Sequence, residues 1–167
     1  MKNSILFILF ISVSLSFVKK SKTSTPEEFA GTLFSIIKQN DEKALVDLFL
    51  TNKEISETID ESSMEKEVAA SFKEEFIEKL NKDREKTIEK LKDGFSKIRA
   101  DIESKECENN IKLGAITPKV ATLRNLPLEM GELDFEYICT TDTQLVSIAV
   151  INTNKGWRIL EKIRLVD

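Results

Sequence analysis

Residues 144–166 read QLVSIAVINTNKGWRILEKIRLV. Two runs rich in β-branched residues, Gln144–Asn152 and Trp157–Val166, flank the short segment Thr153-Asn154-Lys155-Gly156. Two such runs joined by a short loop that contains glycine predict a β-hairpin.

Two further strands are predicted before this hairpin. Residues Glu132–Cys139 alternate apolar and acidic side chains, as a strand with one buried face does. Residues Ile111–Leu123 form another strand region, and Pro118 interrupts it, which suits an edge strand or a bulge. The sequence therefore predicts an antiparallel sheet of about four strands over residues 111–166.

The chain from residue 26 to residue 104 is predicted to be helical. Thr25-Pro26 provides a capping side chain and a proline at a helix start. Asn40-Asp41 interrupts the apolar spacing, and Asp41 is suited to cap a second helix. Residues 52–62 carry two isoleucines and predict a third short turn of helix.

Residues 63–104 are charged and strongly helical. Apolar residues before position 81 recur at a constant spacing of four, which drifts round a helix whose period is 3.6. Those after position 84 alternate spacings of three and four and stay on one face, and Arg84 stands where the apolar stripe should continue. We expect two helices, or one helix kinked near residues 81–84.

Helices first and strands last, without alternation, predict the α+β class. The N-terminal helices are expected to pack on one face of the C-terminal antiparallel sheet. A chain of 167 residues, 41% of them hydrophobic, suits one globular domain, which we assign to residues 26–167.

The first 18 residues, MKNSILFILFISVSLSFV, predict a signal peptide. Lys2 precedes an apolar core that is short for a bilayer-spanning helix, which needs about 20 residues. Three lysines follow this core within residues 19–22 and disfavour export, so an uncleaved N-terminal anchor is the alternative. Residues 19–25 are expected to form a disordered linker. Either alternative places the domain outside the cytoplasm, in the periplasm, in the cell envelope or in the medium.

Cys107 and Cys139 are the two cysteines of the chain. An oxidising compartment allows them to pair, and a bridge would close a loop that contributes about 3–4 kcal/mol to stability. We expect this disulfide at the interface between the helices and the sheet. The alternative is a pair of buried thiols that pack as small apolar groups.

The composition excludes several classes of function. A net charge of −4 argues against nucleic-acid binding, which needs a clustered cationic surface. The absence of histidine excludes a Ser-His-Asp triad, a Cys-His dyad and a His-ligated zinc site within this chain. We therefore expect no metal and no cofactor, and we expect a binding protein rather than an enzyme.

Three residues are candidates for a ligand pocket: Glu161, Tyr137 and Trp157. Strict alternation along the last strand places Glu161 on one face with Trp157 and three aliphatic residues. A carboxylate on an apolar face is costly to bury unless it is paired or protonated. The alternatives are that Glu161 lies where helices leave the sheet uncovered, or pairs with a lysine, and that Tyr137 and Trp157 belong to the core.

Two segments carry a resemblance to a known family. FAGTLFSIIKQNDEKALVDLF at residues 29–49 and LVSIAVINTNKGWRILEKIRLV at residues 145–166 resemble the start and the end of NTF2-like domains. The resemblance implies a cone-shaped α+β domain, a form found in many small exported bacterial proteins. The long helical region 63–104 departs from the usual pattern of this superfamily.

We thus expect an exported, non-catalytic NTF2-like domain that binds a partner protein or a small ligand. One alternative is an interaction or structural protein of the cell envelope that acts through residues 63–104, for example as a homodimer. The other is a small enzyme that uses a carboxylate. No membrane insertion is expected beyond the signal segment.

Overall fold

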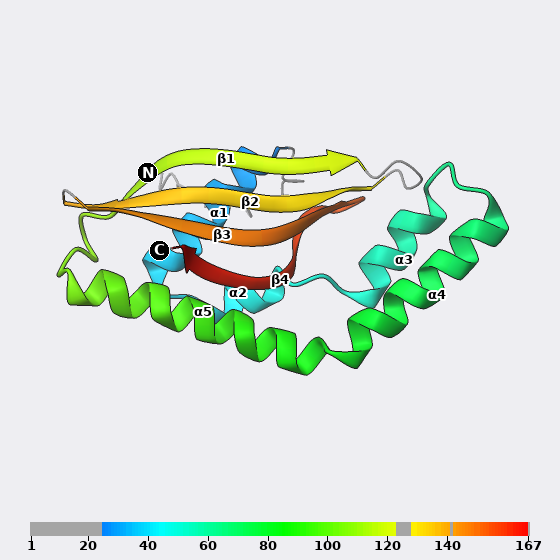
Figure 1. Ribbon diagram of the computed structural model, residues 1–167, viewed down its shortest axis with the longest axis horizontal. Coiled ribbons are helices and arrows are strands. Elements are labelled where there is room, and N and C mark those ends of the chain that lie inside the picture. Colours follow the sequence, from blue (N-terminus) through cyan, green and yellow to red (C-terminus); the bar gives the residue numbers. More distant parts are fainter. Residues whose placement is uncertain (1–24, 123–127, 141, 167) are drawn as a thin grey trace, which may run out of the picture.

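The computed structural model describes residues 25–122, 128–140 and 142–166. The predicted signal peptide lies outside these residues, as does the predicted linker apart from Thr25. Within the described part of the chain, five helices are followed by a four-stranded antiparallel sheet (Figure 1). The α+β class predicted from the sequence is therefore confirmed.

The helices are connected by short segments. Their bounds are α1 (Pro26–Gln39), α2 (Glu42–Asp47), α3 (Asn52–Asp60), α4 (Lys66–Lys82) and α5 (Arg84–Ser104).

The first helix begins and ends at the residues that the sequence indicated, and the second begins where it was expected but ends at Asp47, before the expected end near Thr51. The Thr25 side chain accepts a hydrogen bond from the backbone N–H of Glu28, which caps α1. Asn40 ends α1 in the left-handed conformation, with φ of 54°. Asp41 then caps α2 by accepting a hydrogen bond of 2.9 Å from the N–H of Ala44. The Asn-Asp break is thus a C-cap followed directly by an N-cap.

The region 63–104 forms two helices, α4 and α5, which meet at Asp83. Arg84 stands in the apolar stripe, and its side chain contacts the segment between α2 and α3. Its Nη1 donates a 2.9 Å hydrogen bond to the Leu50 carbonyl oxygen, and its guanidinium lies 5.2 Å from the centre of the Phe49 ring. Arg84 therefore joins the corner between α4 and α5 to a distant part of the chain.

The sheet is a simple meander in the order β1-β2-β3-β4. Its strands are β1 (Lys112–Thr122), β2 (Glu129–Cys139), β3 (Asp142–Thr153) and β4 (Gly156–Val166). Pro118 lies in β1, which is an edge strand, as its missing N–H favours. The irregularity in β1 lies between Leu113 and Ile116 rather than at Pro118.

The main core lies between the sheet and helices α1, α2 and α5. It contains alternate residues of the strands, which point to one face, and the apolar stripes of the helices. Its largest buried side chains include Phe29, Leu33, Ile37, Leu45, Phe49, Leu91, Phe135, Tyr137 and Trp157. Each contributes about 1.5–3 kcal/mol through the apolar surface that it removes from water.

Helix α5 lies close against the sheet at Gly94. A Cβ at this position would overlap the carbonyl oxygen of Ile163 in β4. On either side of Gly94, Leu91, Phe95 and Ile98 are buried against the core. A glycine at this point lets the helix backbone lie directly against β4.

A second core lies round the edge of β4. Residues 48–50 run beside this strand and are joined to it by two backbone hydrogen bonds of 2.9 Å. The N–H of Leu50 donates to the carbonyl oxygen of Ile159, and the N–H of Ile159 donates to the carbonyl oxygen of Leu48. Beyond them α3 and α4 pack against Ile151, which lies on the opposite face from Val150. The helical layer covers one face through α1, α2 and α5 and continues round the edge at one end of the sheet (Figure 1).

Candidate functional site

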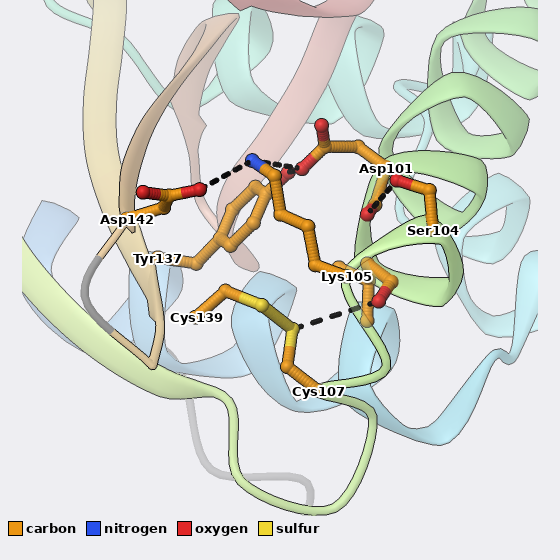
Figure 2. Close-up of a disulfide and its surroundings, with 8 residues drawn as sticks. Asp101, Ser104, Lys105, Cys107, Tyr137, Cys139 and Asp142 are labelled. Atoms are coloured by element: carbon orange, nitrogen blue, oxygen red, sulfur yellow. Dashed lines mark hydrogen bonds and ion pairs between the residues drawn. A yellow bond between two sulfur atoms is a disulfide. The ribbon is translucent and has the colours of Figure 1, made fainter.

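Tyr137 lies in the core beneath the C-terminal part of α5. Its ring is fully buried, and its hydroxyl donates a 2.6 Å hydrogen bond to Asp101 Oδ2 (Figure 2). Lys105 Nζ lies 3.0 Å from the same carboxylate oxygen and 3.9 Å from Asp142. These contacts join α5 to the ends of β2 and β3.

The pKa of Tyr137 is raised above its ordinary value of 10. Burial is the largest cause, followed by the hydrogen bond to Asp101 and the negative charge of that carboxylate. The hydroxyl therefore stays protonated at neutral pH and acts as a hydrogen-bond donor that holds helix to sheet.

The predicted disulfide lies directly beside this cluster. Cys107 follows α5, and Cys139 ends β2, so the bridge between them links the helical layer to the sheet (Figure 2). Both cysteines are buried, and the Cα atoms are 5.6 Å apart. The pairing expected from the sequence, and its place between helix and sheet, are confirmed.

Trp157 is also part of the core, with 1% of its surface exposed. It packs with Phe29, Phe49 and Ile159 in the cluster between the helices and the sheet. Tyr137 and Trp157 therefore both belong to the core, as the alternative interpretation of these two residues had it.

Glu161 is exposed, and the expectation of strict alternation in β4 is wrong at this point. Ile148 pairs with Ile163, and Val150 pairs with Ile159, so the single residue Ala149 of β3 faces the three residues 160–162 of β4. This β-bulge turns Glu161 away from the buried face. The exposure of Glu161 agrees with the alternative interpretation, in which the helices leave this part of the sheet uncovered.

Glu161 lines a groove bounded by α4, α5 and the bulge of β4. The groove has a volume of about 660 Å³, within the range of small-molecule sites. Its apolar residues come from three separate parts of the chain: Phe72, Phe76, Leu80, Met130 and Leu160. All five are partly buried rather than sealed in the core, and the two phenylalanine rings lie 5.6 Å apart.

Charged side chains surround this apolar floor. Four lysines line the groove, at positions 79, 86, 90 and 162, together with the three acids Glu75, Asp83 and Glu161. Among the described residues, no ion pair within 4.0 Å involves any of these seven side chains. The charged groups outnumber the apolar residues of the floor by seven to five and are free to meet a ligand.

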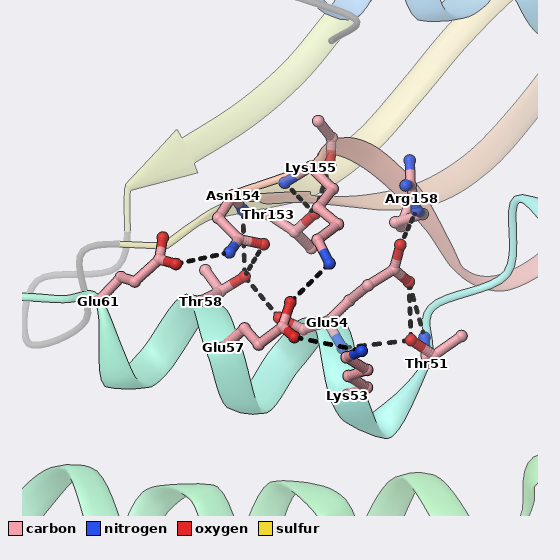
Figure 3. Close-up of polar contacts among 11 residues, drawn as sticks. Thr51, Lys53, Glu54, Glu57, Thr58, Glu61, Thr153, Asn154, Lys155 and Arg158 are labelled. Carbon is pink, nitrogen blue, oxygen red and sulfur yellow. Dashed lines mark hydrogen bonds and ion pairs between the residues drawn. The ribbon is translucent and has the colours of Figure 1, made fainter. Parts of the chain in front are cut away.

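A polar network fixes the wall of the groove by tying α3 to the hairpin between β3 and β4 (Figure 3). Arg158 Nε donates a 2.7 Å hydrogen bond to Glu54 Oε1, and Glu54 Oε2 accepts from the backbone and side chain of Thr51. Lys155 lies 2.7 Å from Glu57. Since α4 packs against α3, these contacts also position α4 relative to β4.

The pKa of Glu54 shows that this network favours the ionised carboxylate. Burial raises the pKa, but the hydrogen bonds from Arg158 and Thr51 and the charge of Arg158 outweigh it. The pKa of Glu54 therefore lies below its ordinary value of 4.5.

Charged side chains also cover the sheet face opposite the main core. Lys119 Nζ contacts Asp134 Oδ2 at 2.6 Å, and Arg164 reaches across β3 to Glu132 at 2.7 Å. Burial raises the pKa of Asp134, yet the hydrogen bonds from Lys119 and Ser147 bring it below its ordinary value. Asp134 is buried on this face, with 5% of its surface exposed.

Within the described residues, no group of three or more cysteine, aspartate or glutamate side chains is arranged to hold a metal ion. Among the helices of that same part of the chain, none is both long enough and apolar enough to cross a bilayer.

No pattern in the sequence predicts the groove. Its residues fall in three segments, 72–90, Met130 and 160–162, which the fold brings together. Among these residues, the sequence indicates Glu161 alone, because of its predicted place on an apolar strand face rather than in this groove. No protein-family model matches the chain, and neither a curated protein nor a solved structure matches it.

Proposed function

We propose that this protein is an exported, non-catalytic domain of the NTF2-like type that binds a small ligand in the groove between α4, α5 and β4. The observation that carries the proposal is the groove itself: about 660 Å³, with an apolar floor and seven charged side chains without ion-pair partners among the described residues. Such a combination suits recognition, because the floor supplies affinity and the charges supply orientation.

The architecture supports the NTF2-like assignment. Helix α1, the Asn40-Asp41 break and α2 precede a meander whose last hairpin enters β4 through Gly156 and Trp157. In this chain, large side chains fill the space between the helices and the sheet. The proposed site therefore lies outside that interior, where α4 and α5 extend beyond the usual pattern.

The disulfide supports the proposed location. Disulfides persist in oxidising compartments and are rare in the cytoplasm. The bridge between Cys107 and Cys139 accordingly fits a protein exported by its N-terminal segment.

The test is native mass spectrometry on protein isolated without denaturation from the cells that make it. Thr87 lines the groove, whereas Ser96 lies on the exposed side of α5, so Thr87→Trp fills the groove and Ser96→Trp is its matched control. We expect a bound small molecule with the wild type and Ser96→Trp, and much less with Thr87→Trp. An empty wild-type protein, or equal occupancy in both variants, contradicts the proposal.

A second candidate function is self-association through α4. Val68 is 50% exposed, and no residue of this helix is fully buried. This candidate predicts that sedimentation velocity shows association at high protein concentration, which Val68→Lys abolishes. The neighbouring exposed residue supplies the control, Ala70→Lys, which should still associate. A single monomeric species at every concentration contradicts it.

A further inference from the structure

The two sides of the groove differ in character. The side formed by α4 carries Phe72, Phe76 and Leu80 beside the charged residues Glu75 and Lys79, and Met130 and Leu160 of the sheet continue its apolar part. The side formed by α5 contributes polar and cationic groups. Among the described lining residues, all of the apolar ones therefore lie on the side of α4 and the sheet, and those of α5 are polar or cationic.

The cationic side combines lysines from two elements. Lys86 and Lys90 lie one turn apart on α5, and Lys162 comes from the bulge of β4. Like charges at this helical spacing repel each other, which costs a few tenths of a kcal/mol. On this side the described lining also holds two carboxylates, Glu161 of β4 and Asp83, the N-cap residue of α5, so bases outnumber acids here by three to two.

We infer that the ligand is a single-chain amphiphile with an anionic head, its tail on the floor of Phe72, Phe76, Leu80, Met130 and Leu160 and its head between Lys86, Lys90 and Lys162. This inference rests on the proposed function and specifies its ligand class. An anionic head relieves the repulsion among the lysines, and charge-assisted hydrogen bonds to it are stronger than neutral ones.

The shape of the site favours one free molecule over a membrane surface. Walls from α4, α5 and the sheet bound the groove, so a single chain fits where a flat bilayer would not. The net charge of the protein, −4, also opposes adhesion to an anionic bilayer.

Isothermal titration calorimetry with dodecanoate tests the inference, and dodecyl maltoside, with the same tail and a neutral head, is the comparison ligand. Both are used below their critical micelle concentrations. We expect one dodecanoate per chain, with binding about tenfold weaker in K86Q/K90Q. Lys43 and Lys97 are exposed and do not line the groove, so K43Q/K97Q is the matched control and should bind as the wild type does.

Three results would overturn the inference. The first is that dodecanoate and dodecyl maltoside bind with equal affinity, and that K86Q/K90Q leaves both affinities unchanged. The groove would then bind the apolar tail without recognising the head group. Binding to phosphatidylglycerol vesicles but not to free dodecanoate points to a membrane surface. If neither amphiphile binds, the inference fails, and native mass spectrometry of the wild type decides separately whether the groove holds some other ligand.

Discussion

Gly94 and Gly31 both lie in helices, but their surroundings differ. A Cβ at Gly94 overlaps backbone atoms of Ile163, whereas a Cβ at Gly31 has nothing within 4 Å. We expect Gly94→Ala to lower the free energy of unfolding by about 1–3 kcal/mol, because α5 must move away from β4. Gly31→Ala should raise it by about 0.5–1 kcal/mol through helix propensity. Urea unfolding of the two variants measures both changes, and a Gly94→Ala protein as stable as Gly31→Ala contradicts the close packing of α5 on β4.

Glu54 makes the stability of the protein depend on pH. Its pKa is lowered in the folded state, so its contribution is present above its ordinary value of 4.5 and is lost as pH falls below that value. We expect Glu54→Gln to lower the free energy of unfolding by about 1–3 kcal/mol at neutral pH and to flatten its decline in acid. The experiment is urea unfolding from pH 7 downward.

Glu57 supplies the control for this prediction. It pairs with Lys155 and Lys53 at the surface, and surface ion pairs contribute little. Glu57→Gln should therefore change stability at neutral pH less than Glu54→Gln does. An equal loss in the two variants would show that the contact between Glu54 and Arg158 is no stronger than a surface pair.

The exposed position of Glu161 is a feature that the sequence did not predict. Alternation correctly places Trp157, Ile159 and Ile163 in the core. It fails for Glu161, because β4 has two more residues than β3 between the paired positions, and no glycine or proline in Leu160-Glu161-Lys162 announces a bulge. A bulge of this kind depends on pairing with another strand, which local sequence does not contain.

Among the elements, the disulfide joins the end of the helical layer to β2. Its cysteines are 32 positions apart, and the chain-entropy relation assigns the closed loop about 3–4 kcal/mol. We expect the free energy of unfolding of the Cys107→Ser/Cys139→Ser variant to be lower than that of the oxidised wild type by about this amount. The variant should therefore unfold at a markedly lower urea concentration. Counting thiols in the unreduced, exported protein gives an independent check. Two reactive thiols there would contradict the bridge.

The order and type of the elements follow from local signals in the sequence. Thr25, Asn40 and Asp41 mark helix ends through their capping chemistry, and Arg84 marks the break between α4 and α5 through the loss of the apolar stripe. The sequence did not predict that residues 48–50 run beside β4, or that α3 and α4 pass round this edge. These are contacts between segments far apart in the chain, and no local pattern specifies them.

At the scale of the whole molecule, the groove arises because α4 and α5 meet at an angle over the bulged edge of the sheet (Figure 1). Two linkages hold this arrangement: Arg84 joins the corner to Leu50, and the contact between Glu54 and Arg158 ties α3, on which α4 packs, to β4. The site could not be predicted from the sequence, because its residues become neighbours only after these distant contacts form.

The proposed function depends most on this groove as the place where a ligand would bind. Two-dimensional ¹H–¹⁵N NMR of the intact domain, titrated with dodecanoate, tests it directly. We predict that the largest shift changes fall on residues 72–90, Met130 and residues 160–162, with little change at Lys119 and Asp134. Changes confined to Lys119, Asp134 and their neighbours in the sheet, or no changes at a concentration of dodecanoate that saturates calorimetric binding, would contradict this proposal.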